Sequence, residues 1–338
     1  MEMKKSILFF AAGAVLLAAC SNDDENVGTD NGPVEARITA SLSGPITRAV
    51  GTNWNADRIG VMVTNAPNSD MENLYKNVLY TTSSTGATAD FIATTGQGIF
   101  FQDATETVTF SAYAPYKESA ANALPGTDGD GVVTVDTEDN NTTTAQESIN
   151  FLFASGATAT RTNNTVTFAD ATPETSGDAD DHSFHHRMAQ LNVVFQTSTT
   201  AGFNADDIFD ATSFNLGGLK HEGTFNVTDG TATATGNTVA SWDITGCKYT
   251  DDNTANTRTY SLILLPQNLS SAPLNVSVVL AGQTYTNTTA INPNLEAGLT
   301  YTYTITVTKT GLQVSGCTIT NWGNGTTGSG NAEMPTQQ

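Results

Sequence analysis

Three histidines and one aspartate-bearing turn have the residue types and spacing that come closest to a metal site. His182, His185 and His186 lie close together in the chain. Because successive side chains of a strand point to opposite faces, at most two of the three could share a metal ion. The Asp128–Gly131 turn carries two aspartates but lacks the further ligands of a calcium loop at the required steps. We therefore predict hydrogen-bonded strand and loop residues here, and no metal ion.

Paired carboxylates could act as the two acids of a glycosidase. Asp206–Asp207 and Asp251–Asp252 are such pairs, but both lie in polar, loop-like sequence. Glycosidases hold their carboxylates about 5–10 Å apart in a cleft, and solvated loop acids are the simpler interpretation here. The chain also has no GxSxG, GxxxxGK[ST], HExxH or CxxC motif. We predict no catalytic residue and no cofactor, and hence no enzyme.

The charge balance excludes one class of partner. The 338 residues include 13 basic and 34 acidic ones, which gives a net charge of −21. A protein that binds the phosphate backbone needs a basic face, so nucleic acid is not expected as a partner. Hydrophobic residues make up 38% of the chain, which is enough for a core.

The N-terminus has the features of a lipoprotein signal. Lys4 and Lys5 precede an apolar run that ends at Cys20. That run is shorter than the roughly 20 residues that span a bilayer, so residues 1–19 are expected to be a signal peptide. The sequence LAAC at 17–20 resembles a bacterial lipobox, in which Cys20 would carry acyl chains such as palmitate and anchor the protein to the outer membrane. The alternative is an ordinary signal with a chance cysteine.

An acidic stretch follows the lipobox at Ser21–Glu25 and resembles the surface-export tag of Bacteroidetes lipoproteins. The alternative is a solvated linker. The two remaining cysteines, Cys247 and Cys317, could form a disulfide in an oxidising compartment. Two buried free thiols that pack as small apolar side chains are the alternative.

From Arg37 onward, the pattern predicts an all-β protein. Residues 301–308 alternate apolar and Thr, and 107–114 and 190–195 show the same period of two. The polar stretch at 170–181 suggests a boundary between two tandem β-sandwiches. We expect a leader with the first strand at 20–48, sandwiches at 49–183 and 184–322, and a polar tail at 323–338 that is too poor in apolar residues to pack as a strand.

One arginine has the setting of a protease site. Arg48 and Ala49 follow a Gly-Pro stretch, behind the leader and ahead of the later strands. An arginine in such an extended stretch is open to an Arg-specific protease. The alternative is an ordinary surface arginine.

Taken together, several segments in order make the chain resemble the Bacteroidetes fimbrillin family, of the major-fimbrillin and Mfa-like kind, which are subunits of type V pili. Besides the lipobox, acidic leader and Thr47-Arg48-Ala49, the segments that carry the resemblance are TFSAYAPY at 109–116, FHHRMAQL at 184–191, LLPQ at 264–267, LEAGLTY at 295–301 and ITNW at 319–322.

The resemblance implies two transthyretin-like β-sandwiches, export as a lipoprotein, cleavage at Arg48–Ala49 and polymerisation with other pilin subunits by donor-strand exchange. In that scheme, cleavage lets the early strand with Ile38, Ala40 and Leu42 leave its sandwich. The vacated sheet edge would then take a strand from a neighbouring subunit. The protein would lie on the cell surface and then in the fimbrium.

The chain differs from a simple stalk subunit in its C-terminal segment. Only polar sequence follows Trp322, so the donor strand would be 312–322, with Leu312, Val314 and Ile319 as anchors. A disulfide at Cys317 would tether it. We therefore expect a subunit that accepts a strand but donates poorly, such as a tip or accessory subunit. The alternative is an anchored surface lipoprotein that binds glycan or a host protein as a monomer.

Overall fold

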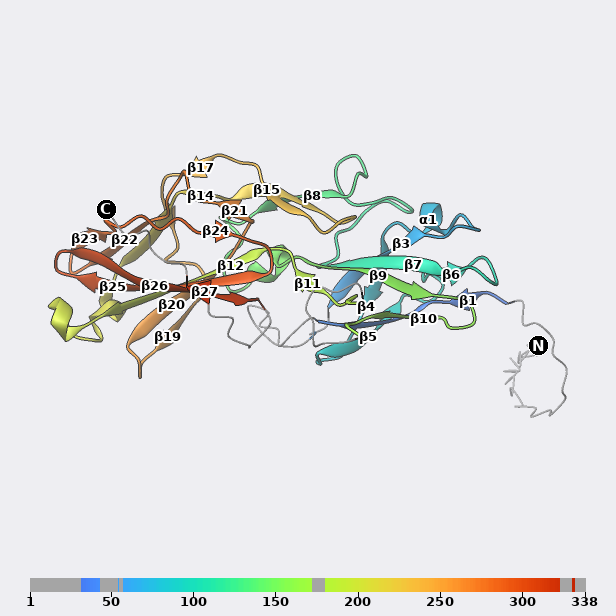
Figure 1. The fold of residues 1–338 in the computed structure, drawn as a ribbon, viewed down its shortest axis with the longest axis horizontal. Coiled ribbons are helices and arrows are strands. Elements are labelled where there is room, and N and C mark those ends of the chain that lie inside the picture. Colours follow the sequence, from blue (N-terminus) through green and yellow to red (C-terminus); the bar gives the residue numbers. More distant parts are fainter. Residues whose placement is uncertain (1–31, 43–53, 55–56, 172–179, 323–329, 332–338) are drawn as a thin grey trace, which may run out of the picture. The chain divides into compact units, whose positions relative to one another are not determined.

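The computed structural model describes residues 32–42, 54, 57–171, 180–322 and 330–331. These residues are almost all in strands, turns and short loops, which confirms the all-β fold (Figure 1). The few helical turns are α1 (Met71–Leu74) and the 3-10 turns η1 (Gln146–Ile149), η2 (Thr199–Ala201) and η3 (Asp207–Asp210). Along the described ranges, no helix has the length and apolar content needed to cross a membrane.

The N-terminal half is built on one eight-stranded sheet. In spatial order its strands are β10 (Thr165–Phe168), β2 (Arg37–Ser41), β5 (Thr88–Ala93), β4 (Val78–Thr81), β3 (Arg58–Asn65), β7 (Val108–Ala114), β9 (Leu152–Ala159) and β11 (His185–His186). A short ladder of β1 (Val34–Glu35) and β6 (Phe100–Phe101) accompanies it.

The two ends of this sheet lie near each other, so it wraps around a core. Strand β10 is first in the strand order and β9 is next to last, yet a tight turn closed by Thr160 N–H and Asn163 C=O joins them. Leu42, just after β2, also forms a parallel bridge to Phe184, just before β11. The enclosed core contains the inward side chains of β2, β3, β7, β9 and β10. Two packed layers around one apolar interior are what a β-sandwich requires.

The C-terminal half contains a six-stranded and a four-stranded sheet. The first has the order β19 (Tyr249–Asp252), β20 (Thr257–Leu264), β12 (Ala189–Thr197), β25 (Leu299–Thr308), β26 (Gly311–Asn321) and β27 (Gly330–Asn331). The second has the order β18 (Trp242–Asp243), β13 (Ser213–Gly217), β22 (Asn275–Leu280) and β23 (Gln283–Thr286). In β25, Tyr301, Tyr303, Ile305 and Val307 are buried, as their alternation predicts.

Smaller ladders complete the fold. They are β16 (Ala232–Ala234), β15 (Glu222–Asn226) and β8 (Val132–Asp136) in one sheet, β14 (Leu219–Lys220) with β17 (Thr238–Val239), and β21 (Gln267–Asn268) with β24 (Asn294–Leu295).

The expected boundary near residue 183 is crossed by main-chain pairing. Strand β8 pairs with β15, and β11 pairs with β9. A third apolar cluster also draws on both halves, and in it Phe151 stacks on Phe225 with ring centroids 4.3 Å apart. Residues 33–338 form one compact unit, so the two-domain count is not confirmed.

The tail contains one short strand that the sequence analysis did not expect. Gly330 and Asn331 form β27, which pairs antiparallel with Ile319 and Thr318 of β26. The expectation that the tail is too poor in apolar residues for a strand was wrong at these two positions. Ladder hydrogen bonds join main-chain groups and do not require apolar side chains.

Candidate strand-acceptor site

Strand β2 is paired on both sides, although it lies in the segment expected to be the N-terminal leader. It runs antiparallel to β5, with Ile38 opposite Phe91, and parallel to β10, with Ala40 in register with Phe168. We call the position between β5 and β10 the β2 slot. A strand that left this slot would expose unpaired N–H and C=O groups on two neighbours, which is a template for another strand.

The side chains of β2 divide by face as the period of two requires. Ala36, Ile38, Ala40 and Leu42 are buried, with 6% exposure at most. Arg37 is exposed on the opposite face. Burying a large aliphatic side chain contributes about 1.5–3 kcal/mol. Ile38 and Leu42 therefore supply most of the free energy of apolar burial that keeps β2 in the sheet.

Two polar pairs secure the outer face of β2 to β5. Thr39 Oγ1 donates to Asp90 Oδ1 at 2.9 Å, and the hydroxyls of Ser41 and Thr88 lie 2.9 Å apart. Both pairs are exposed, so each contributes less than a buried bond would.

Trp54 is the most notable residue at this site. Its side chain is fully buried, and its indole Nε1–H donates to the carbonyl oxygen of Ala40 at 3.1 Å. Its main-chain N–H donates to Gly86 C=O at 2.9 Å, just ahead of β5. Trp54 lies beyond Arg48 in the chain, whereas Ala40 lies before it. The indole thus joins the segments on either side of the expected protease site.

Four rings surround the C-terminal part of β2, and we call them the aromatic cage: Trp54, Phe91, Phe168 and Phe184. Trp54 makes edge contacts to Phe91 and Phe184, with centroids 5.0 and 5.2 Å apart, and Phe168 to Phe184 is 5.7 Å. All four rings are buried in the same core cluster as β2. Such packed edge-to-face rings hold a defined shape.

The expected processing residues lie outside the described part of the chain. This applies to the lipidation residue Cys20 and to the cleavage pair Arg48 and Ala49. Leu42 is the last described residue before that pair, and Trp54 is the next after it.

Cys247 and Cys317 are both free thiols in this structure. Of the two alternatives, the structure therefore corresponds to unpaired cysteines, and the argument that a disulfide tethers the last long strand receives no support. Burial raises the pKa of Cys247 to about 12, with Asp243 adding to the effect. Burial also raises the pKa of Cys317, so both groups are protonated at neutral pH.

The expected donor residues are all in β26. Leu312 is buried, whereas Val314 and Ile319 are half-buried against the same core. Strand β26 pairs with β25 over its whole length, with a bulge opposite Tyr303 and Thr304. The three residues thus pack β26 against the core of its own subunit, where the strand is paired with β25.

The three clustered histidines have separate partners. His182 Nδ1 lies 2.9 Å from Ser155 C=O, and His185 Nε2 lies 2.8 Å from Asp181 Oδ2. His186 Nδ1 lies 2.9 Å from Asn150 Oδ1, and its ring stacks on Trp322 at 4.0 Å. No group of three His, Cys, Asp or Glu that could hold a metal occurs within the ranges that the structure describes.

The paired carboxylates also have structural partners. Asp207 accepts from Asn204 N–H at 2.8 Å. Asp251 binds Arg258 through both oxygens at 2.7 and 2.8 Å, and Asp252 accepts the N–H groups of Thr254 and Ala255. These contacts use the acids in turns and ion pairs.

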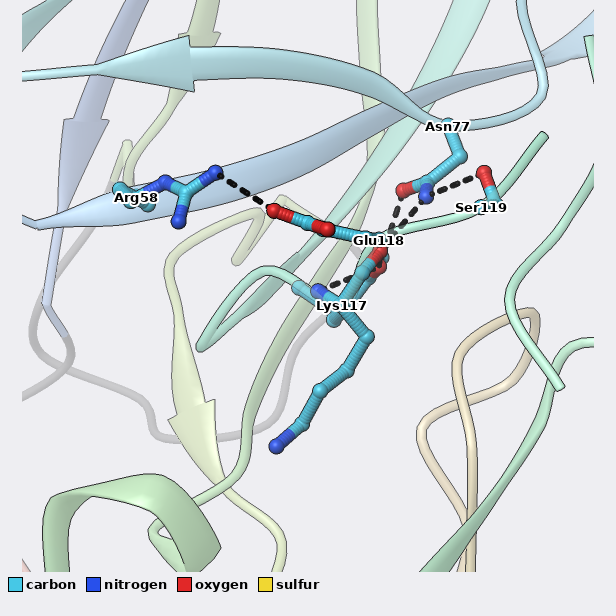
Figure 2. Close-up of polar contacts among 6 residues, drawn as sticks. Arg58, Asn77, Lys117, Glu118 and Ser119 are labelled. Atoms are coloured by element: carbon cyan, nitrogen blue, oxygen red, sulfur yellow. Dashed lines mark hydrogen bonds and ion pairs between the residues drawn. The ribbon is translucent and has the colours of Figure 1, made fainter. Parts of the chain in front are cut away.

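A polar cluster supports the turn after β7, within the TFSAYAPY segment. Figure 2 shows the side chain of Asn77 directed at Ser119 and at the main chain of Lys117, with Nδ2 donating to both at 2.9 Å. The Tyr113 hydroxyl donates to Asn77 Oδ1 at 2.9 Å, and Arg58 lies 3.8 Å from Glu118. Burial raises the pKa of Tyr113, so this hydroxyl remains protonated. The cluster fixes a loop and contains no pairing of a nucleophile with a base.

Trp54 is the functional residue that sequence reasoning missed. The sequence offers one signal for a buried residue here: Trp54 is a single tryptophan in a polar stretch, four residues before β3 begins. Its partner in β2 depends on tertiary packing and cannot be read from spacing.

The geometry describes a β-sandwich protein with the early strand β2 built into its first sheet. A family model described as fimbrillin-like matches residues 47–322. The chain is also 30% identical over 344 residues to "Putative fimbrium subunit Fim1C" of Bacteroides uniformis, covering 98% of this chain and 100% of that protein. The chain belongs to the fimbrillin-like family, and it is a structural, non-enzymatic protein.

Solved structures agree with this assignment. A "putative cell adhesion protein" from Bacteroides ovatus superimposes with a TM-score of 0.66 at 27% identity, covering 86% of this chain and 98% of that one. A second protein of the same description, from Bacteroides uniformis, has a TM-score of 0.60 at 24% identity, covering 86% and 99%, and it shows the fold alone.

Proposed function

We propose that this protein is a pilin-like adhesion subunit that assembles with other pilin subunits by strand exchange at the β2 slot. It would be exported as a lipoprotein acylated on Cys20 and held at the outer-membrane surface. An Arg-specific protease would then cut between Arg48 and Ala49, and the subunit would enter the fimbrium. The family membership and the "fimbrium subunit" relative support the general role.

The observation that carries this proposal is the double pairing of β2. This strand ends at Ser41, shortly before Arg48, yet it supplies buried side chains to the core and main-chain pairs to β5 and β10. Cutting after Arg48 would convert it from a covalent part of the chain into a bound peptide. Its effective concentration would fall sharply, and a competing strand could take its place.

Before cleavage, the subunit's own strand would block the slot and so suppress premature assembly. The net charge of −21 opposes association between copies. Main-chain pairing and apolar burial in the slot must therefore drive assembly.

We further propose an accepting role, as in a tip or accessory subunit. The candidate donor anchors Leu312, Val314 and Ile319 belong to a strand that is fully paired with β25. Donating β26 would cost that pairing and would uncover part of the second core. An accepting subunit needs no such step.

Incubation of the exported protein with an Arg-specific protease tests the proposal. Cleavage after Arg48 should be followed by a ladder of multimers, either with itself or with a donor-bearing pilin from the same cells. The Arg48→Lys variant should remain uncut and monomeric. Clean cleavage without multimers under both conditions would instead favour an anchored lipoprotein that binds glycan or a host protein as a monomer.

A further inference from the structure

The inward face of the β2 segment alternates small and large side chains. Ala36 and Ala40 are 2% and 0% exposed, and Ile38 and Leu42 are 2% and 6% exposed. The buried order is therefore small, large, small, large. Because protein interiors are close-packed, such an order is a shape that an incoming strand must match.

Ala40 is the most completely buried of the four, with 0% exposure. It lies in register with Phe168 of β10, and its carbonyl oxygen receives the Trp54 indole N–H. The aromatic cage packs around this part of the core through edge contacts of 5.0–5.7 Å between ring centroids. A larger side chain here would have to displace buried rings that are already in contact, and overpacking of that kind is destabilising.

The Trp54 hydrogen bond adds a second requirement that does not depend on side-chain type. Any residue offers a carbonyl oxygen, but it must stand at the position of Ala40 O to accept the buried indole N–H. A strand shifted by one residue would point its apolar side chains to the other face. It would also leave a buried donor unpaired, which is costly. Trp54 thus excludes a shift by one residue, and the small position at Ala40 excludes a shift by two, so together they fix the register of the strand in the slot.

We propose that the β2 slot selects an incoming strand with Ala or Gly at the Ala40 position and large aliphatic residues two positions to either side. Trp54 sets the register of that strand by donating to the carbonyl at the small residue. The partner is an extended segment of another pilin subunit with the pattern large–any–small–any–large. This inference rests on the proposed function and adds the sequence class of the strand that is accepted.

Strand β26 of a second copy does not provide this pattern. The slot is a regular ladder on both sides of β2, so its occupant must be a straight strand. If β26 were straightened with Gly316 at the Ala40 position, Thr318 would take the place of the large Leu42, and Leu312 would also fall on the small Ala36 position. Because β26 is the expected donor segment of this chain, we assign the donor to a pilin of different sequence.

The alternative register of β26 also fails. With Cys317 at the Ala40 position, Ser315 would replace the buried aliphatic Ile38. The bulge that lets β26 present apolar residues to its own core, at Gly316 with φ of 63°, has no counterpart in the slot.

Peptide competition on the cut protein tests the inference. The full chain is cleaved after Arg48, the released segment is removed under mildly denaturing conditions and the protein is refolded, and fluorescence anisotropy follows binding of a labelled peptide of residues 33–42. Compared peptides carry Ala40→Leu, or Arg37→Leu as the matched control, which places the same leucine at the exposed position of the outer face. A fourth peptide has the β26 sequence 311–321, and the uncut Arg48→Lys protein is the control for access to the slot.

We expect the 33–42 peptide to bind the cut protein and not the uncut control. Ala40→Leu should weaken binding at least about tenfold, as expected for overpacking of a rigid core, whereas Arg37→Leu should change it by less than about threefold. The 311–321 peptide should bind at least about tenfold more weakly than 33–42. In cut Trp54→Phe protein, all peptides should bind more weakly, but the ratios between their dissociation constants should stay the same.

The possible failures are distinguishable. Equal binding of the Ala40→Leu and unmodified peptides would overturn the selection for a small residue and leave the proposed function standing. Equal binding of the 311–321 peptide would overturn the assignment of the donor to a different subunit. Absence of binding by the 33–42 peptide, or equal binding to the uncut protein, would overturn the proposed function itself and the inference with it. The peptide series uses unmodified protein, so it does not depend on the folding of Trp54→Phe.

Discussion

The indole Nε1–H of Trp54 donates to the carbonyl oxygen of Ala40 at 3.1 Å, and Arg48 lies between these two residues in the chain. The hydrogen bond therefore joins the segment that cleavage would release to the segment that would remain. In the proposed function, it would help to hold β2 in the sheet before cleavage. It also means that cutting alone does not empty the slot, because the non-covalent contacts persist.

Replacing Trp54 by Phe tests the strength of this link in the intact chain. Loss of the buried N–H donor and of some packing should lower the free energy of unfolding by about 1–3 kcal/mol. Urea unfolding followed by circular dichroism measures the change. Ile92→Ala, at a 72% exposed position of β5, is the control and should stay within about 0.5 kcal/mol. A Trp54→Phe effect no larger than that of the control would contradict the assigned link.

The apolar cluster shared by both halves should make unfolding cooperative. Phe225→Ala removes a fully buried ring that stacks on Phe151, and it should cost about 3–5 kcal/mol. Calorimetry of the unmodified protein should show one transition, since residues on both sides of position 183 share this core. Two well-separated transitions, with the variant shifting one of them alone, would support two independent domains.

The cysteines should differ in reactivity. Cys247 is 7% exposed, whereas Cys317 is half-buried. Alkylation of the native protein, mapped by mass spectrometry, should modify Cys317 slowly and Cys247 only after denaturant is added. Recovery of a disulfide-linked peptide containing both residues from the exported protein would contradict the free thiols.

His221 should make stability depend on pH. Burial lowers the pKa of this histidine to about 4, and nearby Asp136 only partly offsets the effect. The unfolded chain, with a pKa near 6.5, then binds more protons than the folded chain between about pH 4 and 6.5. The contribution of His221 to the free energy of unfolding should be fully present above about pH 6.5. It should fall by at most about 3 kcal/mol as the pH drops to about 4, and by less where solvent screens the charge.

The His221→Asn variant isolates this contribution from that of the carboxylates. Asn can keep a hydrogen bond to Thr137 Oγ1, which lies 3.0 Å from His221 Nδ1, but it does not titrate. The difference in unfolding free energy between the two proteins should change between pH 7 and pH 4. A constant difference across that range would show that His221 does not titrate differently on folding.

Periodicity alone was enough to predict the strands. The alternation at 301–308, 107–114 and 190–195 correctly indicated the partly buried strands β25, β7 and β12, because the period of two directly reflects which face is covered. The early strand with Ile38, Ala40 and Leu42 was also correctly anticipated from the same pattern.

Long-range pairing could not be predicted in the same way. Nothing local indicates that β8 pairs with β15, or that β11 adds to β9 across the expected boundary, since both depend on how distant segments meet. The contact from Trp54 to Ala40 is of the same kind. The β27 pairing was missed because a main-chain ladder leaves no apolar signal in a Gly- and Asn-rich tail.

Mass spectrometry of purified multimers tests the central claim most directly. The subunit is cut after Arg48, multimers are isolated, and the amount of the 33–48 segment that remains bound per subunit is measured. Strand exchange at the β2 slot predicts multimers in which this segment is absent and another subunit's strand is protected in its place. Multimers that retain one 33–48 segment per subunit would contradict the account.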